Sequence, residues 1–197
     1  MTPDPATVAA KAALRTQILD RRRARPVRER EAAAAGLTRA LLRGLAGVRV
    51  FAAYVPEDDE PGNGRIPAAF TQLGARVLLP VVPTDGRELA WAVDSGRLAP
   101  GRHGLMEPVG PRLGVTAVGT ADVVVVPALA VARNGIRLGR GAGYYDRALQ
   151  HARPDAVVVA LLFDDEFVDD LPAEPHDRPV TAVVTPSGGW QALPAIG

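Results

Sequence analysis

The pattern of apolar and polar positions divides the chain into a helical N-terminal part and a strand-rich remainder. The Asp-Pro pair at positions 4–5 is typical of a helix start, and this helix is predicted to end near Pro26. A second helix is predicted from residue 27 to residue 44 or 47, although Gly36 interrupts its pattern. Its buried face is predicted from apolar residues four positions apart, namely Leu37, Leu41 and Leu45.

Beyond these helices, the apolar residues gather in short runs rich in β-branched side chains. The predicted strands are 48–55, 76–82, 88–93, 122–131, 156–163 and 180–185. Several runs are apolar at every position, which is typical of strands covered on both faces. Helices are predicted at 64–73 and 143–152, and long loops at 56–64 and 95–112. We therefore expect one domain over residues 1–197, a Rossmann-like three-layer α/β/α sandwich with a largely parallel central sheet.

Composition excludes several classes of function. The net charge of +1 and an aromatic content of 5% argue against a nucleic-acid-binding module. The absence of cysteine excludes disulfides, zinc–thiolate sites and cysteine nucleophiles. The N-terminal segment does not resemble a signal peptide, and no apolar run approaches the roughly 20 residues that cross a bilayer. We expect a cytoplasmic protein, a monomer or weak dimer, with no nucleic-acid or membrane partner.

A glycine-rich stretch with the sequence RLGRGAGYYDRAL covers residues 137–149. Its glycines let backbone N–H groups approach a ligand, and a following helix N-terminus favours an anion. Fixed cations lie on the same stretch, namely Arg137, Arg140 and Arg147. The stretch alone fits a phosphate-binding loop and a turn without ligand about equally. It is not a dinucleotide fingerprint, because the segment ARNGIRL separates it from the preceding strand, and it lacks the Lys and Ser/Thr of a Walker A loop.

One face of the first helix combines apolar and cationic side chains. Leu14 and Ile18 are predicted to face the core, with Lys11 and Arg15 beside them. The two cations fit either snorkelling to solvent or a specific role. Lys11 is the only lysine among 23 basic residues, which favours a role for a compact ammonium group. The run RRRAR at 21–25 is predicted to be a solvated helix end.

Taken together, these features resemble the 5-formyltetrahydrofolate cyclo-ligases, also called 5,10-methenyltetrahydrofolate synthetases. The matching segments occur in family order along nearly the whole chain: KAALR (11–15), YVPEDDEPG (54–62), LLPVV (78–82), GRHGLMEP (101–108), DVVVVPALAVARNGIRLGRGAGYYDRAL (122–149) and EPHDRPVTAVVTP (174–186). The resemblance implies a Rossmann-like fold and an ATP- and Mg²⁺-dependent enzyme. Its substrates would be a reduced folate and ATP, and its products 5,10-methenyltetrahydrofolate, ADP and phosphate.

The resemblance also assigns roles to individual positions. It implies catalytic roles for Lys11, Arg140 and Tyr145. It implies ATP binding by Lys11, Arg15, Gly139, Arg140, Gly141, Gly143, Tyr144 and Arg147. It implies folate binding by Glu60, Glu107, Tyr144 and Tyr145, and metal binding by Asp146 and Asp177. Alternatives from the residues alone are a first-turn helix acid for Asp146, a solvated acid for Glu60, a loop-shaping role for Glu107 and a core position for one tyrosine. His103 and His176 are expected to be structural or exposed.

Three positions depart from the residues usual in this family. Ala132 and Thr181 stand where an aspartate is common, and Ala142 replaces a glycine or lysine. These departures motivate a second hypothesis, a non-catalytic folate- or nucleotide-binding relative. A third is a different enzyme on this type of fold, such as a sugar-phosphate isomerase, which leaves Lys11, Glu60 and the tyrosines without a role.

Overall fold

The computed structural model describes residues 4–174 and 177–194; His176 lies outside them. The helices are α1 (Pro5–Ala24), α2 (Val27–Gly44), α3 (Ala68–Gln72) and α4 (Tyr144–Ala148), with 3-10 helices at Arg102–Gly104, Val115–Thr120 and Asp164–Glu166. The strands are β1 (Val50–Ala52), β2 (Arg76–Val81), β3 (Ala90–Val93), β4 (Leu98–Pro100), β5 (Met106–Pro108), β6 (Arg112–Gly114), β7 (Val123–Val126), β8 (Ala130–Ala132), β9 (Arg137–Leu138), β10 (Val157–Leu161), β11 (Phe167–Val168), β12 (Ala182–Thr185) and β13 (Gly189–Ala192).

The largest sheet has eight strands in the order β13-β12-β10-β7-β1-β2-β3-β6. Its five central strands run parallel, and β3, β6 and β13 are added antiparallel at the edges. The expected α/β class and largely parallel sheet are confirmed. The strand order reverses between β1 and β7, since β2 lies on one side and β10 and β12 on the other. Loops that leave these two strands diverge, which opens a crevice at their carboxyl ends.

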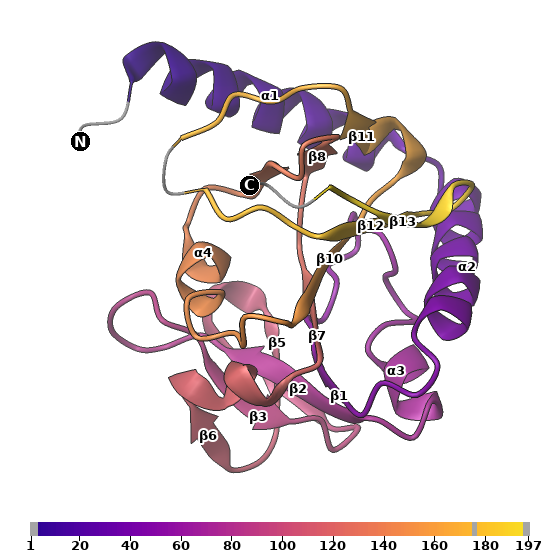
Figure 1. Cartoon of the computed structure of the whole chain (residues 1–197), viewed down its shortest axis with the longest axis vertical. Coiled ribbons are helices and arrows are strands. Elements are labelled where there is room, and N and C mark those ends of the chain that lie inside the picture. Colours follow the sequence, from indigo (N-terminus) through magenta and orange to yellow (C-terminus); the bar gives the residue numbers. More distant parts are fainter. Residues whose placement is uncertain (1–3, 175–176, 195–197) are drawn as a thin grey trace.

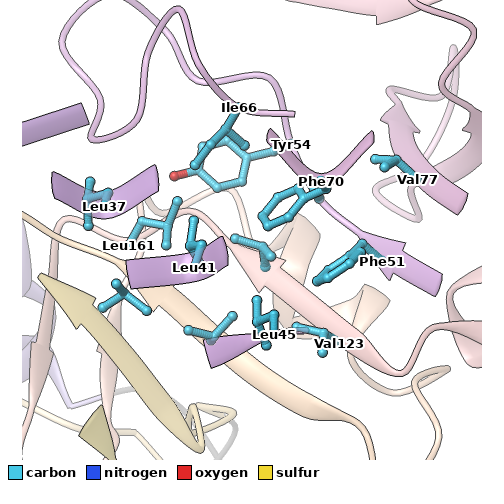
Figure 2. Close-up of a cluster of buried hydrophobic side chains, with 14 of the residues drawn as sticks. Leu37, Leu41, Leu45, Phe51, Tyr54, Ile66, Phe70, Val77, Val123 and Leu161 are labelled. Atoms are coloured by element: carbon cyan, nitrogen blue, oxygen red, sulfur yellow. The ribbon is translucent and has the colours of Figure 1, made fainter. Parts of the chain in front are cut away.

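One face of the sheet is covered by α2 and α3, as Figure 1 shows. The predicted apolar face of α2 packs there, and Leu37 and Leu41 are fully buried against strand residues such as Leu161 (Figure 2). The Phe51 and Phe70 rings stack with centroids 4.5 Å apart. Gly36 was expected to interrupt the second helix, but α2 continues through it. A Cβ at this position would lie 3.0 Å from the carbonyl oxygen of Pro186, so glycine permits close packing.

The opposite face of the sheet carries a second apolar cluster. It includes the alternate residues of the same strands, such as Val124 and Ala160, together with side chains of α4 such as Ala148. Because both faces are covered, the central strands β1, β7 and β10 are apolar at every position, as predicted for several runs. The predicted strand 122–131 is instead two strands, β7 and β8, which belong to different sheets. Pro127 lies between them, and it ends the first run because it has no N–H to donate.

The first helix packs on a small sheet in the order β11-β8-β9. Asp4 caps it through hydrogen bonds from the backbone N–H groups of Ala6 and Thr7, at 3.3 and 3.1 Å, as its sequence predicts. Ile18 is buried among Leu129, Leu138 and other residues of this small sheet. This contact sets the same face of α1 against the glycine-rich stretch that follows β9.

The prediction that residues 21–25 form a solvated helix end is wrong for Arg22. This side chain is 0% exposed, and its Nε and Nη2 donate to the two carboxylate oxygens of Glu166 at 2.7 and 2.8 Å. Arg22 continues the buried stripe of α1, and burial is possible because Glu166 neutralises its charge. Among the described helices, none combines the length and apolar character of a membrane span.

Candidate functional site

A cleft with a volume of about 660 Å³ opens at the carboxyl ends of β1, β2 and β7. Tyr54 and Val55 follow β1, Val82 follows β2, and Pro127 and Ala128 follow β7. The cleft therefore lies at the crevice that the strand order creates. It brings together all but one of the predicted site residues: Lys11, Arg15, Glu60, Glu107, Gly139, Arg140, Gly141, Gly143, Tyr144, Tyr145, Asp146 and Asp177. Arg147 is absent from its walls.

The glycine-rich loop is held by arginine side chains that bind its carbonyl groups. Arg15 Nε donates to Gly139 O at 2.9 Å, and Arg147 Nη1 donates to Gly143 O at 2.9 Å. Arg147 therefore braces the loop from outside the cleft. Gly141 has φ 100° and Gly143 has φ 72°, backbone conformations that favour glycine. Occupied carbonyl groups leave the backbone N–H groups as the loop's available partners for an anion.

Lys11 is buried at the end of the cleft. Its ammonium lies 2.7 Å from Glu174 Oε2 and 2.7 Å from Asp177 Oδ2. Burial alone would lower the pKa of Lys11, but hydrogen bonds to Asp177 and Glu174 outweigh it, so the pKa is raised. Lys11 therefore stays charged at neutral pH. The Lys11 side chain does not snorkel to solvent. Its ion pairs instead connect α1 to Glu174 and Asp177.

The two predicted metal ligands each pair with a cation. Asp146 Oδ1 lies 2.6 Å from Arg137 Nη2, and Asp177 pairs with Lys11. Within residues 4–174 and 177–194, no three acidic or histidine side chains gather closely enough to hold a metal ion. A magnesium site made of protein ligands alone does not fit this cleft. Binding through one carboxylate, water and nucleotide phosphates, which is common for Mg²⁺, fits Asp146.

Arg140 lies among three carboxylates of the loop that follows β1. Its Nη2 is 2.7 Å from Glu57 Oε2, 3.1 Å from Asp59 Oδ1 and 3.2 Å from Glu60 Oε1. Glu60 is only 7% exposed, so it is not the solvated loop acid of the alternative interpretation. Burial raises the pKa of Glu60, although the Glu57 backbone N–H and Arg140 lower it. This cluster joins the glycine-rich loop to the opposite wall of the cleft.

The two tyrosines differ in their surroundings. Tyr145 is partly buried and packs against the apolar clusters on both faces of the sheet, whereas Tyr144 packs against one of them. The Tyr145 hydroxyl group is buried and has no hydrogen-bond partner among the described residues. Burial and the nearby charge of Glu60 raise the pKa of Tyr145 well above its ordinary value. Tyr145 therefore presents a neutral hydroxyl group at the cleft wall.

Glu107 shapes the hairpin formed by β4 and β5. Its Oε1 accepts a hydrogen bond from the backbone N–H of Val82 at 2.9 Å, which ties the hairpin to the end of β2. A Cβ on Gly101 would lie 2.3 Å from the Glu107 side chain, so the two residues depend on each other. This is the loop-shaping role that the sequence left open, although Glu107 also lines the cleft. His103 is exposed at the cleft margin.

The three departures from family residues have distinct surroundings. Ala132 is fully buried in β8, beside apolar residues that pack against α1. Thr181 Oγ1 accepts a hydrogen bond from the Val158 N–H at 2.9 Å and so binds the sheet backbone. The carbonyl of Ala142 accepts a hydrogen bond from Arg87 Nη1 at 3.5 Å. Ala132 and Thr181 thus serve packing and strand pairing.

Sequence reasoning missed several residues of the cleft. Glu57, Arg87 and Glu174 line it, and each contacts a predicted site residue or loop. Glu57 lies three positions before Glu60, so the acidic run EDDE was a signal that could have marked it. Glu174 likewise lies three positions before Asp177, at the start of the segment EPHD, whereas Arg87 carries no comparable signal.

Comparison with known proteins gives a consistent result. The model of the 5-formyltetrahydrofolate cyclo-ligase family matches residues 7–186. A 5-formyltetrahydrofolate cyclo-ligase of Mycolicibacterium smegmatis is 46% identical over 190 residues, which cover 93% of this chain and 97% of the relative. One from Escherichia coli K12 is 33% identical over 146 residues, with 71% and 79% covered.

Solved structures agree with these relatives. A 5,10-methenyltetrahydrofolate synthetase of Aquifex aeolicus superposes with a TM-score of 0.74 at 26% identity, covering 95% of this chain and 94% of that one. The synthetase of Mycoplasma pneumoniae gives 0.72 at 21% identity, covering 90% and 99%, and at this identity supports the fold alone. The chain belongs to the 5-formyltetrahydrofolate cyclo-ligase family.

Proposed function

We propose that this protein cyclises 5-formyltetrahydrofolate to 5,10-methenyltetrahydrofolate in a reaction that consumes ATP and requires Mg²⁺. The observation that carries the proposal is the convergence in one cleft of a glycine-rich loop, five cationic side chains and a buried carboxylate. The cations are Lys11, Arg15, Arg87, Arg137 and Arg140, and the carboxylate is Glu60. The family membership and the 46% identity with a cyclo-ligase support the same reaction.

The chemistry explains why ATP is required. The formyl group on N5 is an amide, so its carbon is a poor electrophile and its oxygen a poor leaving group. Transfer of the γ-phosphoryl group from ATP to this oxygen gives an imidate-like phosphate and ADP. N10 of the same folate then forms a bond to the formyl carbon, and the oxygen departs as part of phosphate. The protein's contribution is to position the two substrates and to neutralise charge.

The cations of the cleft are suited to the charge of ATP, and most already pair with carboxylates. Lys11 pairs with Glu174 and Asp177, and Arg137 pairs with Asp146. We propose that phosphate oxygens replace part of these carboxylate contacts. Such an exchange keeps each cation paired, so that none is left buried and unpaired in either state.

The folate is proposed to bind where Glu60, Tyr144 and Tyr145 line the cleft, beside Arg140. Glu60 supplies acceptors for the donor edge of the pterin, and Tyr144 and Tyr145 supply aromatic surface. The hydroxyl group of Tyr145 is proposed to donate to the formyl oxygen in the second step, when this oxygen gains negative charge as it departs with phosphate. Its raised pKa keeps the proton on the hydroxyl at neutral pH. A donor aimed at developing charge contributes more in a desolvated site than in water.

Magnesium is proposed to enter with ATP. When bound, it would neutralise charge on the phosphate oxygens. Asp146 would hold it together with nucleotide phosphates and water, and the second oxygen of this carboxylate faces no recorded partner among the described residues. Arg137 would then orient the carboxylate through its bond to Oδ1. Asp177 would stay with Lys11, and the protein alone would supply few metal ligands.

A direct test uses purified protein with 5-formyltetrahydrofolate, ATP and Mg²⁺. The expected result is a rise in the near-ultraviolet absorbance of the methenyl product that depends on ATP.

The second candidate, a folate-binding relative without turnover, is favoured by Ala132 and Thr181. It predicts calorimetric folate binding with no absorbance change. Since both residues fill packing or sheet positions, we propose that they are compatible with turnover.

We also infer that residues 4–194 form one Rossmann-like domain of three layers. The apolar clusters on the two faces of the large sheet support this inference, since α2 and α3 belong to one and the residues around α4 to the other. These two clusters share the strands of one sheet, and the remaining cluster among the described residues is smaller and packs under α1.

A further inference from the structure

The guanidinium group of Arg140 faces more carboxylate oxygens than one of its nitrogen atoms can satisfy. Oxygens of Glu57, Asp59 and Glu60 lie at 2.7, 3.1 and 3.2 Å from the same Nη2 atom. A terminal guanidinium nitrogen carries two hydrogens, so three acceptors compete for two donors. The additional contact from Arg140 Nε to Glu60 is also long, at 3.3 Å. The two contacts of Arg140 with Glu60 are therefore the longest that it makes to these three carboxylates.

Glu60 is also the carboxylate that most needs a partner. It is the most buried of the three, at 7% exposed, whereas Glu57 and Arg140 are both more than a third exposed. Its Oε2 accepts the backbone N–H of Glu57 at 3.0 Å, and its Oε1 has only the two long contacts to Arg140. A buried charged acceptor with weak partners gains strongly from a better donor. Three carboxylates against one guanidinium also leave an excess of negative charge.

Arg140 is also in a position to bind phosphate, because it lies within the glycine-rich loop. Its neighbours Gly139 and Gly141 line the cleft where the phosphates of ATP are proposed to bind. The side chain cannot serve three carboxylates and a phosphate at once. Moving it to a phosphate without another change would leave Glu60 buried without a good donor. When folate is absent, the free-energy cost of leaving Glu60 without a donor weakens nucleotide binding.

The reduced pterin offers the donors that Glu60 lacks. Its aminopyrimidine edge carries an amino group beside a ring N–H in one plane, an arrangement of donors similar to that of a guanidinium. On the basis of the function proposed above, we infer that this edge replaces Arg140 at Glu60 and releases Arg140 to the phosphates of ATP. Folate and ATP then bind cooperatively, because each removes the cost that the other meets. Thermodynamic linkage requires the effect to be equal in both directions.

Isothermal calorimetry on the full chain tests this inference. The dissociation constant of a non-hydrolysable ATP analogue with Mg²⁺ is measured with and without saturating 5-formyltetrahydrofolate. We expect folate to tighten binding of the analogue by about 10-fold, within the usual range of coupling between two sites. In Arg140→Gln, the coupling factor should fall to about 1, because no side chain remains to be exchanged. Arg140 is half-exposed, so this variant is expected to fold.

Two acidic residues of the same loop provide a matched pair of variants. Asp59 contacts Arg140, whereas Asp58 contacts Asn63 and Arg30. Both Asp59→Asn and Asp58→Asn remove one negative charge. In Asp59→Asn, the analogue alone should bind several-fold more tightly and the coupling should shrink. Asp58→Asn should retain the coupling of the unaltered protein.

The outcomes separate this inference from the proposed function. Equal affinity for the analogue with and without folate, in a protein that still forms the methenyl product, would overturn the inference alone. Identical behaviour of Asp59→Asn and Asp58→Asn would overturn it as well, because a general charge effect would then explain the data. A protein that binds neither ligand and forms no product would overturn both proposals.

Discussion

The buried hydroxyl group of Tyr145 is not explained by the requirements of folding. It is sequestered in the cleft wall and finds no hydrogen-bond partner in the described residues. An unpartnered buried hydroxyl costs stability, so its retention indicates a role with a ligand. Its ring packs against apolar residues, and phenylalanine would make the same packing contacts.

Tyr145→Phe should separate these two effects. We expect the free energy of unfolding to stay the same or to rise by up to about 1 kcal/mol, because an unsatisfied polar group is removed. We expect kcat/KM to fall by about 10–100-fold, the equivalent of one lost hydrogen bond to a developing charge. Denaturant unfolding and the absorbance assay measure the two quantities. Full activity in the variant would contradict the role of the hydroxyl group.

Gly101 supports the site through a steric requirement. A Cβ would collide with the Glu107 side chain, whose Oε1 accepts the N–H of Val82. Gly101→Ala should therefore displace Glu107, raise the KM for folate and speed hydrogen exchange at the Val82 amide. Gly110 is a matched control, since an added Cβ there meets nothing within 4 Å. If Gly101→Ala and Gly110→Ala behave alike, the coupling of Gly101 to Glu107 is wrong.

For individual residues, the sequence predicted which side chains line the cleft better than it predicted which side chains contact each other. Lys11, Glu60 and Tyr145 do reach one cleft, and family order along the chain pointed to them. The pairing of Lys11 with Glu174 could not be predicted, because 163 positions separate the two residues. Such a contact depends on how α1 packs against the small sheet, and no local pattern encodes that packing.

At the scale of elements, α1 is joined to the rest of the protein by a buried ion pair. Arg22 binds both carboxylate oxygens of Glu166, and its Nη2 also donates to the carbonyl of Ala128 at 2.7 Å. Ala128 lines the cleft, so the pair also steadies the backbone between β7 and β8. Burial raises the pKa of Glu166, although the hydrogen bonds from Arg22 lower it.

Arg22→Met should destabilise the protein by about 3–5 kcal/mol at pH 7, because Glu166 is left buried without its partner. Removal of Arg22 raises the pKa of Glu166 further, so the folded state holds this proton more tightly than the unfolded chain. Stability of the variant should therefore recover as the pH falls from 7 toward the ordinary glutamate pKa of 4.5, because protonation neutralises Glu166. Denaturant unfolding across this range measures the effect.

Two further variants control this prediction. Arg23→Met removes an exposed cation of the same helix, whose pair with Asp20 lies in solvent, and it should have little effect. The double variant Arg22→Met/Glu166→Leu should recover much of the lost stability, because no buried charge remains unpaired. A loss in Arg22→Met that is independent of pH and is not recovered would contradict the account of this pair.

The elements themselves were largely predictable, and the exceptions have physical reasons. Helices α1 and α2 follow from a cap, a proline boundary and a four-residue repeat. The run 122–131 was predicted as one strand because apolar residues continue through it, yet Pro127 divides it between two sheets. The run 21–25 was predicted to be solvated because its composition is cationic, and burial of Arg22 depends on a distant carboxylate.

For the whole molecule, the arrangement of the sheet explains where the site lies. Strand order reverses between β1 and β7. The loop after β1 carries Glu60 to one wall of the cleft, and the segment after β7, which includes β8 and β9, carries the glycine-rich stretch to the other. Alternation of short apolar runs with helices predicted a largely parallel sheet. Which strands lie side by side could not be read from it, since strand order depends on packing between distant segments.

Transfer of the formyl oxygen tests the central proposal most directly. The protein is supplied with ATP, Mg²⁺ and 5-formyltetrahydrofolate labelled with ¹⁸O in the formyl group, and the released phosphate is examined by mass spectrometry. We predict one ¹⁸O atom in each phosphate, formed in step with the methenyl absorbance. Methenyl product with unlabelled phosphate would contradict phosphorylation of the formyl oxygen, and the absence of both products would contradict the proposed function itself.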